Sequence, residues 1–135
     1  MRTGFSTGRF LAAYVAGLGT MLVLDALWLN YAITSFQAAL GDMLLDSIRL
    51  APAAVFYLSY IALVLAFAID WKSQRLAPAA LRGAGLGLIG YGTYELTNHA
   101  TMVRWTVGLV MTDLAWGAFL TAVVAAVGQY VATRR

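Results

Sequence analysis

The sequence predicts an all-α membrane protein, a bundle of four transmembrane helices with both termini on the cytoplasmic side. Three observations lead to this prediction. The 135 residues are 61% hydrophobic and 11% charged, with a mean hydropathy of +0.77, whereas soluble domains carry about 25% charged residues. Four long apolar segments follow one another, and the basic residues gather in alternate connections between them. The composition excludes a disordered chain and a nucleic-acid-binding module, and it makes the lipid bilayer the expected surroundings.

Each apolar segment is long enough to cross about 30 Å of hydrocarbon at about 1.5 Å per residue. Within a single domain, residues 1–135, the expected spans are residues 10–31, 51–69, 79–102 and 105–131. The third segment is the least apolar, because it contains Arg82, Glu95, Asn98 and His99.

The distribution of basic residues supports all four spans. Of the nine Lys and Arg residues, Arg49 and Arg104 alone occupy the two connections assigned to the outside. The others lie near the termini and the middle connection: Arg2, Arg9, Lys72, Arg75, Arg82, Arg134 and Arg135. Cytoplasmic segments carry the excess of basic residues, so this bias places both ends in the cytoplasm.

The connection after the first span contains a candidate surface helix at residues 36–48. Phe36, Leu40, Met43 and Leu44 recur at helical spacing, while Asp42 and Asp46 share another face. This pattern predicts a short amphipathic helix that lies on the outer membrane surface.

Glycines are concentrated in the third segment. Residues 85–90 match G-x-G-x-x-G, but they lie inside an apolar span rather than between a strand and a helix, which argues against a dinucleotide site. Gly83, Gly87 and Gly90 recur on one helix face and form a smooth groove that another helix can approach closely. We expect this groove to serve packing within the chain or a homodimer.

Three acids lie at membrane depth, namely Asp25, Glu95 and Asp113. An acidic side chain at the centre of a membrane helix costs about 2.5–3.5 kcal/mol. The predicted topology places all three in the outer half of the bilayer, within one or two helical turns of the same height. We therefore expect them to face the bundle interior, one another or water.

Helical spacing gives these acids polar and aromatic neighbours. Asp-x-x-Trp occurs in both the first and the last span, and Tyr57 and Tyr60 of the second span are placed to close the ring. The candidate ligand-binding or proton-binding residues are Asp25, Trp28, Tyr91, Tyr94, Glu95, Asn98, His99, Asp113 and Trp116.

Simpler interpretations of these residues remain open. The acids are equally able to hydrogen-bond across helices in protonated form, and the aromatic residues, Trp105 above all, are typical of an interfacial belt. Without a basic residue at their depth, the three carboxyls cannot all be ionised cheaply, and Glu95 is our first candidate for a neutral acid.

A metal site would combine Glu95 and His99 with Asp25 or Asp113. Di-iron bundles instead use Glu-x-x-His from each of two helices, and this chain has one histidine, no cysteine and Asn98 at the i+3 position. We therefore expect neither a metal nor a cofactor.

The leading functional hypothesis is a binding or transport protein for protons, a cation or a small cationic amphiphile. Aromatic faces attract cations, and carboxylates neutralise them. A structural subunit of a larger membrane complex is an alternative. The sequence names no catalytic residue.

Several motifs together resemble a known family. They are YGTYELTNHA at residues 91–100, Trp105, Asp113-x-x-Trp116-Gly117, LDALW at residues 24–28, and Phe56-Tyr57-x-x-Tyr60. With these motifs the chain resembles, over nearly its whole length, the bacterial membrane-protein family called domain of unknown function 2177. The family pattern has Asp at the position of Glu95 and an apolar or small residue at that of His99. The resemblance implies a four-helix protein of the bacterial inner membrane. It also implies a further hypothesis, a membrane enzyme or accessory subunit in lipid modification or the oxidative-stress response.

Overall fold

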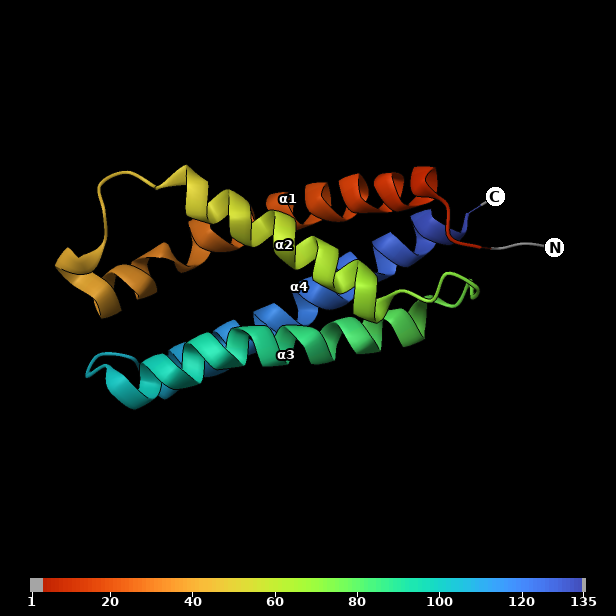
Figure 1. Ribbon diagram of the computed structural model, residues 1–135. Coiled ribbons are helices and arrows are strands. Elements are labelled where there is room, and N and C mark those ends of the chain that lie inside the picture. Colours follow the sequence, from red (N-terminus) through yellow and green to blue (C-terminus); the bar gives the residue numbers. More distant parts are fainter. Residues whose placement is uncertain (1–3, 135) are drawn as a thin grey trace.

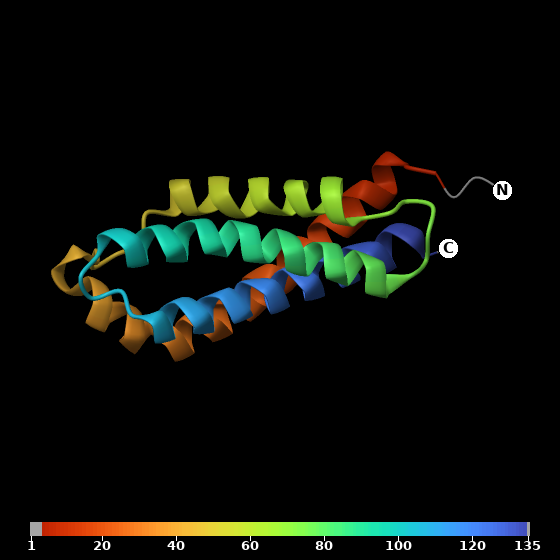
Figure 2. The ribbon, with the colours of Figure 1, turned by 90° about the horizontal axis from the view of Figure 1, so that it is seen from below.

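A computed structural model describes residues 4–134, which form four α-helices and no strand. The helices are α1 (Thr7–Leu40), α2 (Leu50–Ala68), α3 (Leu76–Thr101) and α4 (Val107–Thr133), with one 3₁₀ turn, η1 (Gly41–Met43), after α1. They run alternately up and down, so that α1 begins and α4 ends at the same end of the bundle (Figures 1 and 2). We call this the terminal end and the opposite one the distal end. The expected all-α bundle is confirmed.

The helix starts follow from local chemistry. Ser6 and Thr106 cap α1 and α4, where their side-chain oxygens accept hydrogen bonds from the backbone N–H three residues on, at 3.3 and 3.2 Å. The other two helices share the sequence of their start, Arg-Leu-Ala-Pro-Ala-Ala at 49–54 and 75–80, in which the arginine is the N-cap residue. Proline is tolerated in a first turn because the N–H groups there have no partner within the helix.

The structure departs from the expected separate surface helix at residues 36–48. α1 continues without a break past Tyr31 to Leu40, a length of about 51 Å at 1.5 Å per residue. Gly41 then ends it with a φ of 56°, a conformation that glycine adopts without strain. Residues 44–49 contain no helix. The first part of the predicted amphipathic segment thus belongs to a helix longer than the bilayer is thick.

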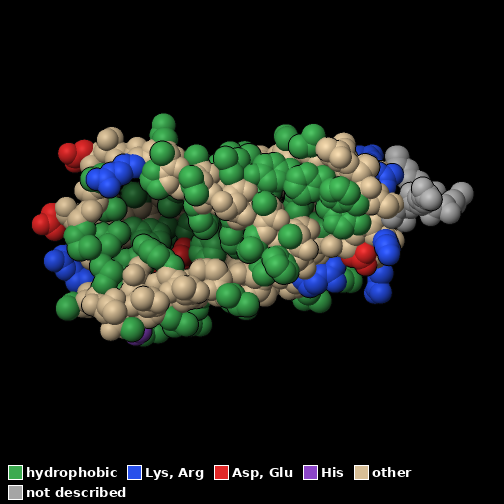
Figure 3. All heavy atoms as spheres, viewed as in Figure 1, with side chains coloured by type: hydrophobic (Ala, Val, Ile, Leu, Met, Phe, Trp, Pro, Cys, Tyr) green, Lys and Arg blue, Asp and Glu red, His purple; other side chains and the backbone are tan. Residues whose placement is uncertain are grey.

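Three helices in the described part of the chain are long and apolar enough to cross a membrane: α1 with η1, α2 and α4. α3 has a sufficient length of 26 residues and lies along α4 in both views (Figures 1 and 2). Large hydrophobic side chains cover the outside of the bundle, and the charged side chains visible in Figure 3 gather mainly at its two ends. This distribution is that of a bundle surrounded by lipid.

The terminal half is a packed apolar core. Ile61, Leu65, Leu120 and Val124 are fully buried, and α1 approaches them at Gly17, next to Ile61 and Val124.

One polar side chain, Gln129 of α4, is fully buried at the terminal end. Its Oε1 accepts from the backbone N–H of Asp70 at 2.8 Å, and its Nε2 donates to the backbone oxygens of Asp70 and Ser73. These bonds fasten the connection between α2 and α3 to α4.

The glycines of α3 bring it into backbone contact with α4. A Cβ at Gly83 would lie 2.6 Å from the Cβ of Ala125, and one at Gly87 would overlap the carbonyl oxygen of Gly117. Gly90 instead faces the ring of Tyr60. Packing within the chain therefore fills, at Gly83 and Gly87, the groove that we considered for a homodimer.

Replacing Gly87 should push α3 away from α4. Gly87→Ala is expected to lower the free energy of unfolding by about 3 kcal/mol, because the new methyl group displaces backbone rather than a flexible side chain. Detergent titration in mixed micelles measures this change. Gly85→Ala is the matched control, since a Cβ at Gly85 meets no heavy atom within 4 Å. Equal unfolding midpoints for the two variants would contradict the interpretation.

Candidate functional site

The structure brings Asp25, Glu95 and Asp113 together in the distal half of the bundle. Each lies roughly 27–30 Å from the terminal end of its helix, at about 1.5 Å per residue. All three are buried, with exposed fractions of 9%, 0% and 5%. They come from three helices, α1, α3 and α4, so the cluster is a product of the tertiary fold.

The two Asp-x-x-Trp motifs bond crosswise between α1 and α4. The indole N–H of Trp28 donates to Asp113 Oδ1 at 3.1 Å, and that of Trp116 donates to Asp25 Oδ1 at 3.5 Å, the upper limit for a hydrogen bond. The two indoles stack with centroids 4.8 Å apart and an interplanar angle of 6°. We call this arrangement the crossed Asp–Trp pairs. Antiparallel helices allow it, because the same i, i+3 motif then points in opposite directions on the two helices.

The other partners of the acids are also uncharged. The hydroxyl of Tyr57 on α2 donates to Asp25 Oδ2. Glu95 Oε2 accepts from the indole N–H of Trp105 at 2.7 Å. Glu95 Oε1 is the one buried side-chain oxygen or nitrogen without a hydrogen-bond partner among residues 4–134, and its carboxyl neighbours that of Asp113. Burying a carboxyl without donors is costly, so this pair depends on the indole N–H groups of Trp28 and Trp105.

A cavity of about 590 Å³ opens beside the acids, and we call it the apolar cavity. Figure 3 shows a hollow between α2 and α3, with hydrophobic walls and an acidic side chain at its base. Its walls are mainly aliphatic and aromatic, and its ionisable members are two aspartates and three tyrosines. The lining residues are Asp25, Trp28, Leu29, Ile33, Phe36, Leu40, Leu44, Phe56, Tyr60, Leu63, Gly90, Tyr91, Tyr94 and Asp113.

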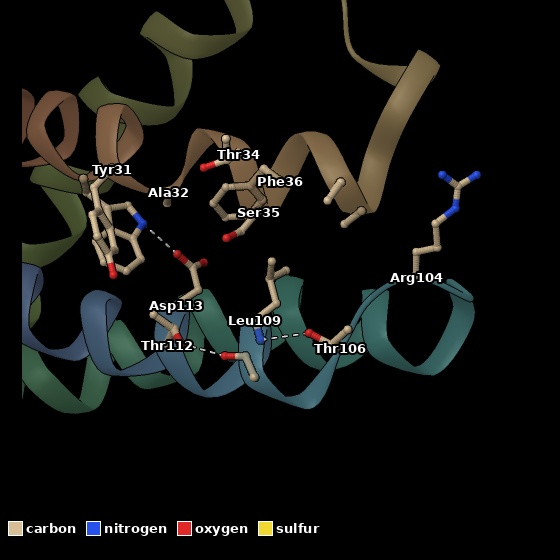
Figure 4. A pocket seen from close by; sticks show the side chains of 14 residues that line it. Tyr31, Ala32, Thr34, Ser35, Phe36, Arg104, Thr106, Leu109, Thr112 and Asp113 are labelled. Atoms are coloured by element: carbon tan, nitrogen blue, oxygen red, sulfur yellow. Dashed lines mark hydrogen bonds between the residues drawn. The ribbon is translucent and has the colours of Figure 1, made fainter.

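A second cavity, of about 760 Å³, lies between the distal halves of α1 and α4, and we call it the polar cavity. Hydroxyl groups from both helices line it, and Arg104 lies at its far end from Asp113 (Figure 4). The lining residues are Trp28, Tyr31, Ala32, Thr34, Ser35, Phe36, Ala38, Ala39, Arg104, Thr106, Gly108, Leu109, Thr112 and Asp113.

The remaining candidate residues separate into two groups. Tyr91 and Tyr94 line the apolar cavity with the acids. Asn98 is half-buried and lines neither cavity, while His99 is exposed and its Nδ1 lies 2.6 Å from the backbone oxygen of Trp105. The chain turns back sharply at Met102–Trp105. The last turn of α3, which carries Asn98 and His99, therefore meets this connection instead of the acids.

Sequence reasoning missed Trp105 as a partner of Glu95. We had assigned it to an interfacial belt, yet its ring is 2% exposed and bonds a buried carboxyl. The sequence feature that could have predicted this contact is the short connection between α3 and α4. It folds the residues just before α4 back over the last turns of α3. Within the described residues, no group of three or more His, Cys, Asp or Glu side chains is placed to hold a metal ion.

The fold and the buried acids define a class, a helical membrane protein with a polar cluster inside its bundle. A family model described as "Predicted membrane protein (DUF2177)" matches residues 10–130, and the chain therefore belongs to this family. The expected resemblance is confirmed. No curated protein and no solved structure matches the chain.

Removing one donor from the crossed Asp–Trp pairs should weaken the contact between α1 and α4. Trp28→Phe keeps a ring but leaves Asp113 Oδ1 without its donor, and we expect a loss of about 0.5–2 kcal/mol in the free energy of unfolding. Near-ultraviolet circular dichroism should also lose the signal of the stacked indoles. Trp71→Phe is the control, because Trp71 packs on the rings of Phe5 and Phe10. A Trp28→Phe variant as stable as this control would argue against a bonded pair.

Proposed function

We propose that the protein binds a small amphiphile with a cationic head, which it takes from the outer leaflet of a bacterial inner membrane. The observation that carries the proposal is a pair of buried carboxyls, Asp25 and Asp113, in an otherwise apolar cavity that opens sideways between α2 and α3. Its volume of about 590 Å³ suits a small ligand, since ligand pockets generally measure about 300–1,000 Å³.

Charge selects the head group of this ligand. No Lys or Arg belongs to the lining of the apolar cavity, so an anionic head would meet carboxyls without compensation. A cationic head finds the two aspartates and the ring faces of Trp28, Tyr60 and Tyr91. The aliphatic wall, formed by side chains such as Leu29, Ile33 and Leu63, accommodates an alkyl chain.

Binding of a cation should release a proton. A cationic head and a proton compete for the same carboxyls, Asp25 and Asp113, because each neutralises negative charge there. The affinity should therefore fall as the pH falls through the range in which the cluster titrates, by about tenfold per pH unit if one proton is exchanged.

The binding test uses decyltrimethylammonium and the protein in lipid nanodiscs, followed by calorimetry. Asp25→Asn and Asp113→Asn should each weaken binding about tenfold or more, because each removes a negative charge at the head group. Asp46→Asn removes an exposed acid outside both cavities and should bind as the wild type does. Decanoate, with an anionic head on a chain of similar length, should not compete. Wild-type protein that binds neither probe would overturn the proposal.

The proposed orientation places the distal end outside. Lys72, Arg75, Arg82 and Arg134 support it, because their segments meet at the terminal end, whereas the distal connections carry Arg49 and Arg104. The chain has no cysteine, so single cysteines report the side directly. In intact cells, Asp42→Cys should react with a membrane-impermeant maleimide and Ser73→Cys should not. The reverse pattern would invert the topology.

A further inference from the structure

The two cavities meet at a common wall. Trp28, Phe36 and Asp113 line both, and Asp113 is the one ionisable side chain they share. Its carboxyl points from α4 towards α1, beneath Ser35 and Phe36, where it accepts the hydrogen bond of Trp28 (Figure 4). One carboxyl is therefore approached from two sides that differ in chemistry.

The polar cavity lies along the distal turns of α1. α1 is about 51 Å long and a hydrocarbon core is about 30 Å thick, so the distal turns of α1 extend beyond the core. Tyr31–Ala39 of α1 and Thr106–Asp113 of α4 supply most of the cavity wall. Hydroxyl side chains at this level bind water, and a space of about 760 Å³ accommodates many water molecules at roughly 30 Å³ each.

From this geometry we infer that the polar cavity is the route by which water and protons from the distal side reach Asp113, while the apolar cavity admits the amphiphile. The ligand part of this inference rests on the proposed function, whereas the proton route does not. The aliphatic wall that suits an alkyl chain belongs to the apolar cavity, whereas hydroxyl groups from both helices line the polar cavity. A proton can pass along hydrogen-bonded water and hydroxyl groups.

Titratable and charged groups surround Asp113 on every neighbouring element. Each of them is kept unchanged in the experiment below, and the control variant receives the same charged adduct outside the cavity. They are Asp25 and Tyr31 on α1, Tyr57 and Tyr60 on α2, Tyr91, Tyr94 and Glu95 on α3, and Arg104 in the connection before α4.

A single cysteine placed in the polar cavity tests the route. Ser35→Cys should react with the membrane-impermeant reagent sulfonatoethyl methanethiosulfonate in nanodiscs, whereas Leu63→Cys, in the apolar cavity, should not. The proton readout is an infrared pH jump, with Asp113 identified as the carboxyl band that Asp113→Asn removes. Modified Ser35→Cys should protonate Asp113 about tenfold more slowly than the unmodified variant.

Gln37→Cys provides the matched control. Gln37 is exposed on α1 two residues from Ser35 and lines neither cavity, so its modification should leave the protonation rate unchanged. An unreactive Ser35→Cys, or a modified one that protonates Asp113 at the unmodified rate, would overturn the route. Binding of decyltrimethylammonium is measured separately on the same samples. If the wild type does not bind it, the proposed function fails while the rate comparison still decides the route.

Discussion

Three buried carboxyls need partners that bring no positive charge, and the distal half of the bundle is organised around this requirement. Each acid receives a hydrogen bond from an indole or a phenol of another segment: Asp25 from Tyr57 and Trp116, Asp113 from Trp28, and Glu95 from Trp105. These donors join all four helices through the acids. Because indole and phenol groups are large as well as polar, they stabilise the acids and fill the space between helices at once.

The helices pack differently in the two halves of the molecule. In the terminal half, glycine and alanine bring α3 and α4 into backbone contact, and the fully buried residues between α1, α2 and α4 are mainly aliphatic. In the distal half, the stacked indoles of Trp28 and Trp116 stand between α1 and α4. Both cavities lie in this half of the bundle.

The fold was largely predictable because hydrophobic length and the positions of basic residues act locally along the chain. The common height of Asp25, Glu95 and Asp113 also followed from the sequence, since counting residues from the span ends is enough. The sequence did not show which helix packs against which. The glycines of α3 could equally have faced a second chain, and only the backbone shows that Gly87 meets Gly117.

Other features escaped sequence reasoning for geometric reasons. His99 follows Glu95 by one helical turn, which predicts a shared face, yet its Nδ1 lies beside the backbone oxygen of Trp105, while the indole of Trp105 reaches Glu95. The polar cavity depends on α1 continuing to Leu40, and a hydropathy pattern marks where a segment leaves the lipid rather than where its helix ends. Hydroxyl residues such as Ser35 and Thr112 did not predict a cavity, because they line one only where α1 and α4 face one another.

The anchoring of α2 has a mechanical consequence. At the terminal end its last residues are fixed, because Gln129 holds Asp70 and the Arg82 guanidinium donates to the backbone oxygen of Ala68 at 2.9 Å. At the distal end α2 begins after the non-helical residues 44–49, and Leu50 is 77% exposed. Further along α2, Tyr57 and Tyr60 bond Asp25 and Thr121, so the turns of α2 before Tyr57 are the part without such a restraint. The width of the opening between α2 and α3 is therefore set by the least restrained part of the bundle, so the entrance can adjust to the girth of what passes while the acids at its base stay in place.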